Sequence, residues 1–86
     1  MPITTLLSAA AGELPSSDQI VADGATVRVS VTGQGTILIE PKLTSGYGAG
    51  IEMGGSGARH GFISGPMTFR AYRPAQSAAG LDVETA

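Results

Sequence analysis

The side chains best able to do chemistry in this chain are one histidine and a few tyrosines, arginines and carboxylates. His60 is the only histidine and directly follows Arg59. A catalytic base of the Ser-His-Asp type needs a nucleophile that its surroundings hold in place. No serine or aspartate stands in a recognisable motif with His60. We therefore interpret His60 as a loop or interface residue and expect no catalytic residues.

Metal, phosphate and cofactor sites have equally little support. There is no cysteine, and the carboxylates lack the spacing of a calcium-binding loop. The glycine-rich segment 55–61 lacks the Lys-Ser/Thr ending of a phosphate loop, and segment 48–53 lacks the third glycine of a dinucleotide fingerprint. We expect no metal, no cofactor and no enzymatic activity, and we interpret these glycines as flexible or closely packed β connections.

Tyrosine and arginine give a more specific signal, because both are enriched at interface hot spots. Tyr72 falls on the polar side of a predicted strand, beside Arg70. Isolated exposed aromatics are normal, so an ordinary solvated face is equally consistent with this pattern. For an interface, we expect the contact residues to come from an apolar N-terminal group and a polar group: Ile3, Leu6, Leu7, Tyr47, Arg59, His60, Arg70, Tyr72 and Arg73.

The elements that must position these side chains are short strands. Apolar and polar residues alternate over 26–32, with valine at every second position, and the alternation resumes over 36–40. Such alternation is typical of strands with one buried face. The intervening Gly33-Gln34-Gly35 predicts a three-residue hairpin loop in which Gly35 takes a positive φ.

The register of this predicted hairpin pairs Val29 with Ile39 and sets Arg28 opposite Glu40 on the polar face. A register with a two-residue loop would mix the apolar and polar faces, so the three-residue loop is preferred. Pro41 is expected to end the second strand, because proline removes a backbone donor from the ladder.

A second hairpin is predicted between strands at 67–72 and 80–84. Its register sets Arg70 opposite Asp82, so each hairpin carries one Arg–carboxylate pair on its outer face. Exposed pairs of this kind contribute about 0.2–1 kcal/mol. We therefore expect them to set the register more than the stability.

The remaining elements complete an all-β prediction. Residues 3–9 are interpreted as a strand or extended arm, with a helix at 6–11 as a weaker alternative, and short strands are expected at 19–21, 51–53 and 60–63. Six to eight short strands without a convincing helix predict a small antiparallel β-sandwich or partly open barrel.

Composition indicates one small domain over residues 1–86, in which 1–12 could form an N-terminal arm. Charged residues are 14 % of the chain and the net charge is −2, which gives no basic footprint for nucleic acid. No stretch approaches the roughly 20 apolar residues of a membrane span, and the first residues lack the basic start of a secretory signal. A core of this size is marginal alone, so we expect a homo-oligomer.

Two segments resemble parts of small all-β virion proteins of tailed bacteriophages. Residues 22–33 look like their opening strand, and residues 65–74 with 79–84 look like their closing hairpin. Members of this group are capsid cement or decoration proteins, head-fibre bases or tail adaptor modules, and they are commonly trimers. They share no catalytic motif, so the resemblance carries no functional residue over to this chain.

The resemblance implies a structural protein of the virion, assembled in the host cytoplasm. Foremost it implies a capsid cement or decoration protein that binds the major capsid protein, as a trimer and without nucleic acid or membrane partners. The alternative is a carbohydrate- or receptor-binding module of a fibre or adhesin, with Tyr47 or Tyr72 as its aromatic platform. An enzyme has the least support.

Overall fold

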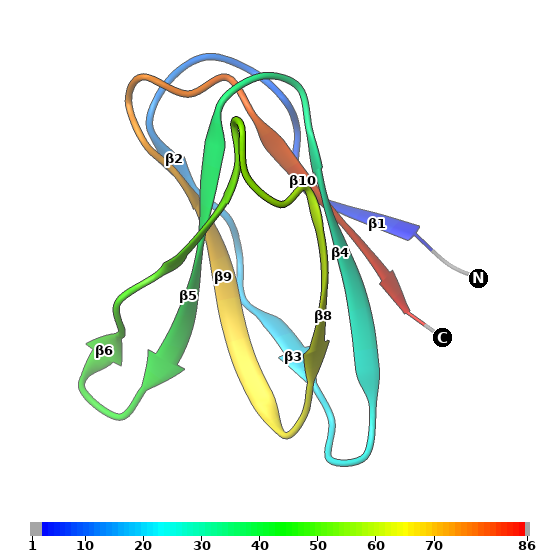
Figure 1. Ribbon diagram of the computed structural model, residues 1–86. Helices are drawn as coiled ribbons and strands as arrows, with labels where there is room; N and C mark the ends of the chain where they lie inside the picture. The colour runs from blue at the N-terminus through cyan, green and yellow to red at the C-terminus, as the bar shows by residue number, and fades with distance from the viewer. Residues whose placement is uncertain (1–2, 86) are drawn as a thin grey trace.

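The computed structural model describes residues 3–85, which form strands and connecting loops (Figure 1). No helix long and apolar enough to cross a membrane occurs in this range. The strands are β1 (Ile3–Leu7), β2 (Leu14–Pro15), β3 (Gln19–Val21), β4 (Thr26–Thr32), β5 (Thr36–Leu43), β6 (Gly46–Tyr47), β7 (Ile51–Gly54), β8 (His60–Ser64), β9 (Met67–Arg73) and β10 (Gly80–Thr85).

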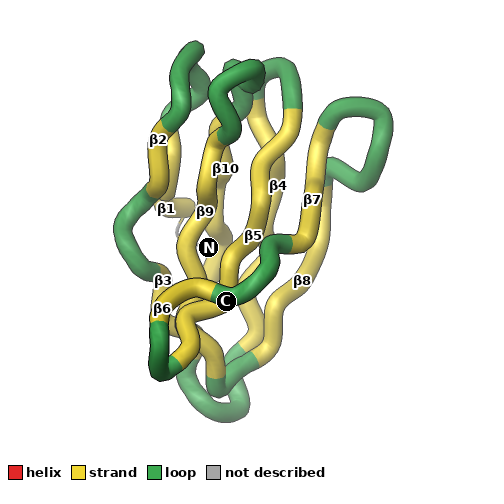
Figure 2. The backbone as a smooth tube through the Cα atoms, turned by 90° about the vertical axis from the view of Figure 1, so that its left-hand side faces the viewer, coloured by secondary structure: helices red, strands yellow, loops and turns green. Residues whose placement is uncertain are grey.

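The strands form two antiparallel sheets that pack into a small sandwich, which confirms the predicted all-β class. One sheet has the order β1-β10-β4-β8 and is here called the β10–β4 sheet. The other has the order β2-β9-β5-β6, with β3 also on β9 and β7 also on β5, and is called the β9–β5 sheet. Figure 2 shows the two layers from the side, with β7 and β8 next to each other at one margin. The described strands outnumber the predicted six to eight because β2 and β6 have only two residues each.

The predicted first hairpin is wrong in its pairing, although its loop is right. Gly33–Gly35 connects β4 and β5, and Gly35 has φ +109° as expected. However, β4 pairs with β10 and β8, whereas β5 pairs with β9, β7 and β6. The loop therefore carries the chain from one sheet to the other. Arg28 lies opposite Glu84 and Phe62 rather than opposite Glu40.

The second predicted hairpin has the same outcome. β9 lies in the β9–β5 sheet and β10 in the other sheet, so the loop between them also crosses the sandwich. Arg70 pairs with Glu40, and Asp82 pairs with Ser30. Alternation buries the same side chains whether two strands are neighbours in one sheet or face each other across the core. The pattern alone therefore cannot choose between the two arrangements.

Pro41 does not end β5, which continues to Leu43. The carbonyl of Pro41 accepts a hydrogen bond from the Gly48 N–H at 2.8 Å, so this residue's backbone groups face the side of β5 that carries β7 and β6. On that side β7 pairs up to Ile39 and β6 pairs from Lys42. The position of the missing Pro41 N–H therefore lies between the ends of β7 and β6. Its absence interrupts no hydrogen bond between strands.

The core lies between the sheets and follows the predicted alternation. Val27, Val29 and Val31 of β4 and Ile37 and Ile39 of β5 are buried together. Phe69, Ala71, Leu81 and Val83 complete its centre from β9 and β10.

The N-terminal segment is a strand, as preferred, and not the alternative helix. β1 pairs with β10 of the same chain, with Ile3 opposite Glu84.

Candidate partner-binding surface

The outer face of the β9–β5 sheet brings together polar and apolar side chains from three strands. The register pairs Ile20 of β3 with Thr68 of β9, and Glu40 of β5 with Arg70 of β9. Because successive side chains of a strand point to opposite faces, these residues lie opposite to the buried Phe69. One continuous surface therefore runs across β3, β9 and β5.

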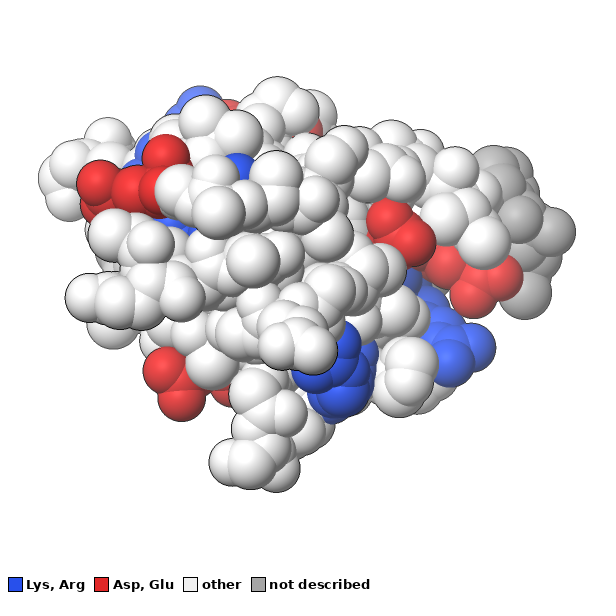
Figure 3. Space-filling model, turned by 90° about the horizontal axis from the view of Figure 1, so that it is seen from above, with Lys and Arg blue, Asp and Glu red and all other residues white. Residues whose placement is uncertain are grey.

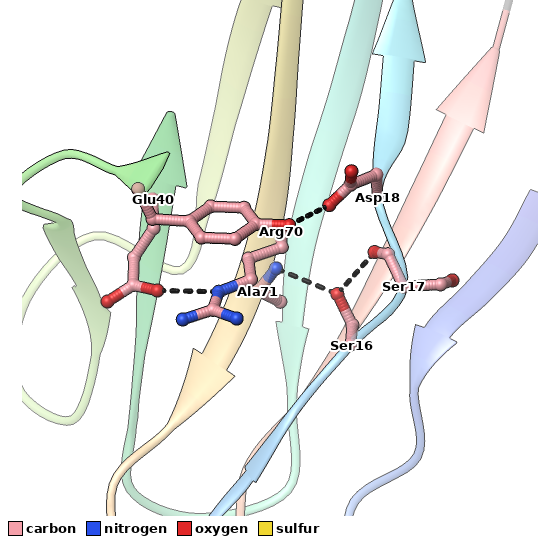
Figure 4. Close-up of polar contacts among 7 residues, drawn as sticks. Ser16, Ser17, Asp18, Glu40, Arg70 and Ala71 are labelled. Carbon is pink, nitrogen blue, oxygen red and sulfur yellow. Dashed lines mark hydrogen bonds and ion pairs between the residues drawn. The ribbon is translucent and has the colours of Figure 1, made fainter. Parts of the chain in front are cut away.

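A connected set of charged and aromatic groups occupies one part of this surface. The Arg70 Nε donates to Glu40 Oε1 at 2.8 Å, and the guanidinium carbon lies 3.7 Å from the centre of the Tyr47 ring. The Tyr47 hydroxyl donates to Asp18, and Lys42 Nζ donates to Asp18 Oδ2 at 3.0 Å. Figure 4 shows Arg70 between Glu40 and the strand segment that carries Asp18. We call these five residues the Tyr47–Arg70 cluster.

Two hydrogen bonds, one from the Ser16 backbone and one to its side chain, hold the Asp18 segment in place. The Ser16 N–H donates to the Ala71 carbonyl at 2.7 Å, and the Ala71 N–H donates to Ser16 Oγ at 2.9 Å. Both bonds tie the segment before β3 to β9, two residues from Asp18 (Figure 4). The carboxylate is thereby presented to Tyr47 and Lys42.

The hydrogen bonds to Asp18 favour a charged Asp18, a charged Lys42 and a neutral Tyr47. The hydrogen bond from Tyr47, with that from Lys42, lowers the pKa of Asp18 below its ordinary value. The same bond to the Asp18 carboxylate raises the pKa of Tyr47, and Asp18 also raises the pKa of Lys42. The charges of Asp18 and Lys42, like those of Glu40 and Arg70, are therefore paired with each other within the chain.

A shallow apolar depression adjoins this cluster. It has a volume of about 580 Å³ and lies between β3, the end of β5 and the start of β9. Ile20 is 72 % exposed and Leu43 is 54 % exposed at its rim, and Lys42 belongs both to its lining and to the Tyr47–Arg70 cluster. We call this depression the Ile20–Leu43 groove. An apolar centre beside fixed polar groups is the anatomy of a protein-binding patch.

Three of the nine candidate residues meet on this surface. Tyr47 and Arg70 are in contact, and the Arg70 guanidinium carbon lies 6.0 Å from the centre of the Tyr72 ring. Ile3 is also exposed, at 64 %, but it lies on β1 in the other sheet.

Two further candidates, Arg73 and Leu7, are buried within the chain, and Leu6 is partly buried. Arg73 is only 3 % exposed, and it donates to the carbonyls of Ser8 at 2.8 Å, Ala79 at 3.0 Å and Gly12. It therefore clamps two loops to β9. Leu7 is part of the core, and Leu6 packs against it.

The remaining candidates, Arg59 and His60, lie at the β7–β8 margin. Arg59 donates to the carbonyls of Val31 at 3.3 Å and Gly33 at 2.7 Å, which fixes the β7–β8 loop to the end of β4. The His60 Nδ1 lies 3.1 Å from Ser30 Oγ on the outer face of the β10–β4 sheet. Over residues 3–85, no three His, Asp or Glu side chains gather as metal ligands would.

Sequence reasoning missed the two most exposed large apolar residues of the described chain, Ile20 on this surface and Phe62 on the other sheet. Ile20 stands beside Val21, and Phe62 stands beside Ile63, so an apolar run hid which member points outward. Phe62 is 75 % exposed on β8. One signal was readable: successive strand residues face opposite sides, so one member of each adjacent apolar pair had to be exposed.

Comparison with protein-family models found no match, and neither the curated proteins nor the solved structures gave a significant one.

Proposed function

We propose that this chain is a structural protein of a tailed-phage virion that binds the major capsid protein as a cement or decoration protein. One observation carries the adhesive part of the proposal. The exposed large apolar side chains of the described residues lie at the margins of the two sheets: Ile3, Leu14, Ile20, Leu43, Tyr47, Ile51 and Phe62. Exposed apolar residues at sheet margins are suited to contacts with other proteins.

The Ile20–Leu43 groove is the contact we assign to the capsid subunit. Its apolar rim can be buried, while the neighbouring charges of Asp18, Lys42 and Arg70 are already paired within the chain. Polar groups that keep their partners avoid much of the cost of leaving water. The fixed positions of Tyr47 and Arg70 also reduce the side-chain ordering that binding would require.

The expected free energies indicate that a single groove binds a capsid subunit weakly. Full burial of Ile20 and Leu43 would contribute about 1.5–3 kcal/mol each, whereas association costs at least about 4 kcal/mol in lost freedom of motion. Copies that are linked in an oligomer bind a regular shell through several grooves at once and gain avidity without new contacts. A repetitive capsid surface suits a binder of this strength.

The phage assignment draws on the resemblance of residues 22–33, and of residues 65–74 with 79–84, to small virion proteins, and on the low surface charge. The face seen in Figure 3 is mostly uncharged, with acidic and basic groups scattered over it. Such a surface is compatible with cover by another protein.

A binding experiment on capsid shells tests the proposal. Purified chain is added to shells of the phage that encodes it, from which this protein has been removed, and the bound copies are counted by quantitative mass spectrometry. We expect regular occupancy and greater resistance of the shells to heat. The double variant Ile20→Thr, Leu43→Thr should lose occupancy, whereas the matched variant Leu14→Thr, on β2 outside the groove, should keep it.

Two results would count against the proposal. Absence of the chain from intact particles and from reconstituted shells would remove the capsid assignment. Equal occupancy of the groove variant and the Leu14→Thr control would remove the groove as the contact.

A second candidate function is a carbohydrate-binding module, and Phe62 is the observation that favours it. Its ring is 75 % exposed beside Arg28 on the outer face of the β10–β4 sheet, and Ser30 and His60 lie in the next row. An aromatic ring with polar neighbours is a common sugar platform. Glycan-array binding that is lost on Phe62→Ala but kept on Tyr72→Ala would support this function over capsid binding.

A further inference from the structure

Strand β8 has an unpaired backbone edge at the margin of the sandwich. Among the described strands it pairs only with β4. The Val31 N–H donates to the Arg59 carbonyl and the Gly65 N–H donates to the Ala25 carbonyl. Odd-numbered residues therefore bond to β4, and antiparallel alternation directs the backbone groups of the even-numbered residues 60, 62 and 64 to the free edge.

The exposed side chains of this edge are arranged around Phe62. His60 and Ser64 are exposed on either side of it, and Phe62 itself is the most exposed large apolar residue of the described chain. A free edge with an exposed phenyl ring at its centre is a template for another strand.

The inner side of β8 has a hollow next to a large side chain. A cavity of about 460 Å³ opens between β7 and β8 and is lined by Val29, Met53, Gly61 and Ile63, among other residues. A Cβ added at Gly61 would lie 3.5 Å from Met53 Cε and 3.8 Å from Val29 Cγ2, which are ordinary contacts. Gly61 is also not among the positive-φ glycines. Neither crowding nor backbone conformation therefore requires glycine here.

We propose that β8 is a dimerisation strand, which pairs antiparallel with β8 of a second copy of this chain about a two-fold axis at Phe62. In this register Phe62 lies opposite Phe62 of the second copy, and His60 lies opposite Ser64. Residues 60, 62 and 64 of each strand then pair their backbone groups with those of the second copy. Gly61 lies opposite Ile63 of the second copy, so each isoleucine fills the hollow that the other copy's glycine leaves.

The second copy fits this edge better than other occupants. A small apolar ligand could fill the hollow but would leave the edge groups of three residues bonded only to water, whereas an added strand pairs them. The strand is complementary to a second copy of itself. Gly61, which leaves a hollow, precedes Phe62, and the large side chain of Ile63 follows it. An antiparallel pair of identical strands is isologous and closes at two copies. This inference is independent of the capsid proposal, because it leaves the Ile20–Leu43 groove uncovered.

Mass measurement in solution tests the proposal without any capsid. We expect sedimentation of the wild-type chain to give twice the chain mass of 8.6 kDa. Phe62→Thr should halve the measured mass, because it removes the central apolar contact. Ile20→Thr, a matched change of an equally exposed apolar residue on β3, should leave the dimer intact.

Gly61→Val separates loss of pairing from loss of folding. The valine fills the hollow from within its own chain and leaves no room for Ile63 of the second copy. We expect a monomer whose thermal unfolding temperature is at least that of a wild-type sample diluted to monomer. An unfolded variant would say nothing on pairing, and Phe62→Thr then decides the question.

A cysteine at position 62 tests the register. The chain has no cysteine, so Phe62→Cys introduces a single thiol. Directly opposed residues of an antiparallel pair have Cα atoms about 5.5 Å apart, which is within the range of a disulfide. Mild oxidation by oxidised glutathione should therefore link two copies of Phe62→Cys rapidly, but not two copies of Ile20→Cys.

Three results would overturn the proposal. The first is a wild-type chain that remains a monomer at the highest soluble concentration. The second is a trimer, the state that the family resemblance implies. The third is a dimer that survives Phe62→Thr and is linked no faster through position 62 than through position 20.

Discussion

Arg73 is the residue whose environment departs most from its sequence pattern. Sequence analysis grouped it with the candidate interface residues, but the side chain is buried and donates to three backbone carbonyls. Those carbonyls belong to Ser8, Gly12 and Ala79, which are far apart in sequence. A planar guanidinium with several fixed donors can hold such a set at once.

Replacement of Arg73 by methionine is expected to destabilise the fold by about 1–3 kcal/mol, because the buried Ala79 carbonyl loses a hydrogen-bond donor. The part-buried bonds to Ser8 and Gly12 add a smaller loss. The free energy of unfolding in urea measures the effect. Arg28→Met is the control, since that guanidinium is 3.9 Å from Glu84 and its side chain is 47 % exposed. A similar loss in both variants would contradict the clamp.

The hydrogen bond between Tyr47 and Asp18 makes the stability of the fold depend on pH, and the direction of this dependence follows from the two pKa shifts. The neutral Tyr47 hydroxyl donates to Asp18, and this bond raises the pKa of Tyr47. A raised pKa means that the bond contributes stability below the ordinary tyrosine value of about 10, and that this contribution is lost as the pH rises through the raised pKa. The lowered pKa of Asp18 acts at the acid end, where the contribution is lost as the pH falls through it.

We expect the Tyr47 hydroxyl to titrate above the ordinary tyrosine value. Tyr47 and Tyr72 are the only tyrosines, so tyrosinate absorbance in Tyr72→Phe reports Tyr47 alone. Adding Asp18→Asn should move the midpoint down, whereas Asp23→Asn should not move it. A midpoint that ignores Asp18→Asn would exclude the hydrogen bond as the cause.

At the scale of elements, the loop from β4 to β5 is the joint between the two sheets. Gly35 has φ +109°, and a Cβ there would lie 2.5 Å from Ser77 Oγ. Ser77 is itself buried, where its Oγ donates to the Thr36 carbonyl at 2.7 Å. The two loops that cross the sandwich therefore pack against each other at one end of the molecule.

This packing predicts a difference between two glycines with positive φ. Gly24 has φ +81° and nothing within 4 Å of an added Cβ. Gly24→Ala should cost about 1–2 kcal/mol from backbone strain alone, and Gly35→Ala should cost clearly more because Ser77 must also move. Chemical denaturation of both variants makes the comparison. Equal costs would mean that the contact between the loops does not matter.

At the scale of the whole molecule, the first and last strands close the fold on each other. β1 pairs with β10, and Leu7 at the end of β1 is 5 % exposed in the core. Residues 3–12 of the expected arm are therefore held to the domain through β1, Leu7 and the Gly12 carbonyl, and residues 1–2 lie outside the described residues. Deleting them would confound partner binding with folding.

Point substitutions in β1 separate these effects. Leu7→Ala is expected to cost about 2–5 kcal/mol, as large-to-small changes in cores do. Ile3→Thr, at a 64 % exposed position, should change the stability by no more than about 0.5 kcal/mol. Thermal and urea unfolding of both variants provide the measurement. A large loss from Ile3→Thr would show that this end of β1 is part of the folded core.

Local patterns predicted the elements but not their partners. Alternation placed β4, β5, β9 and β10 at nearly their observed positions, and short strands were also expected where β3, β7 and β8 lie. The glycine-flanked loop predicted the positive φ of Gly35. The same alternation fits a hairpin and a crossing between sheets equally well. The exchanged ion pairs follow from this ambiguity: Arg28 was paired with Glu40, but Glu40 lies with Arg70 and Arg28 with Glu84.

The sequence by itself determined that the chain is a small all-β domain with an inward face of valine, isoleucine, leucine and phenylalanine. That property depends on side-chain period and composition, which are local. Only the tertiary structure decided which strands are neighbours, that Arg73 is buried, and that Ile20, Leu43 and Phe62 are exposed at sheet margins. These outcomes depend on which sheet each strand joins, a choice made by packing across the core between residues distant in sequence.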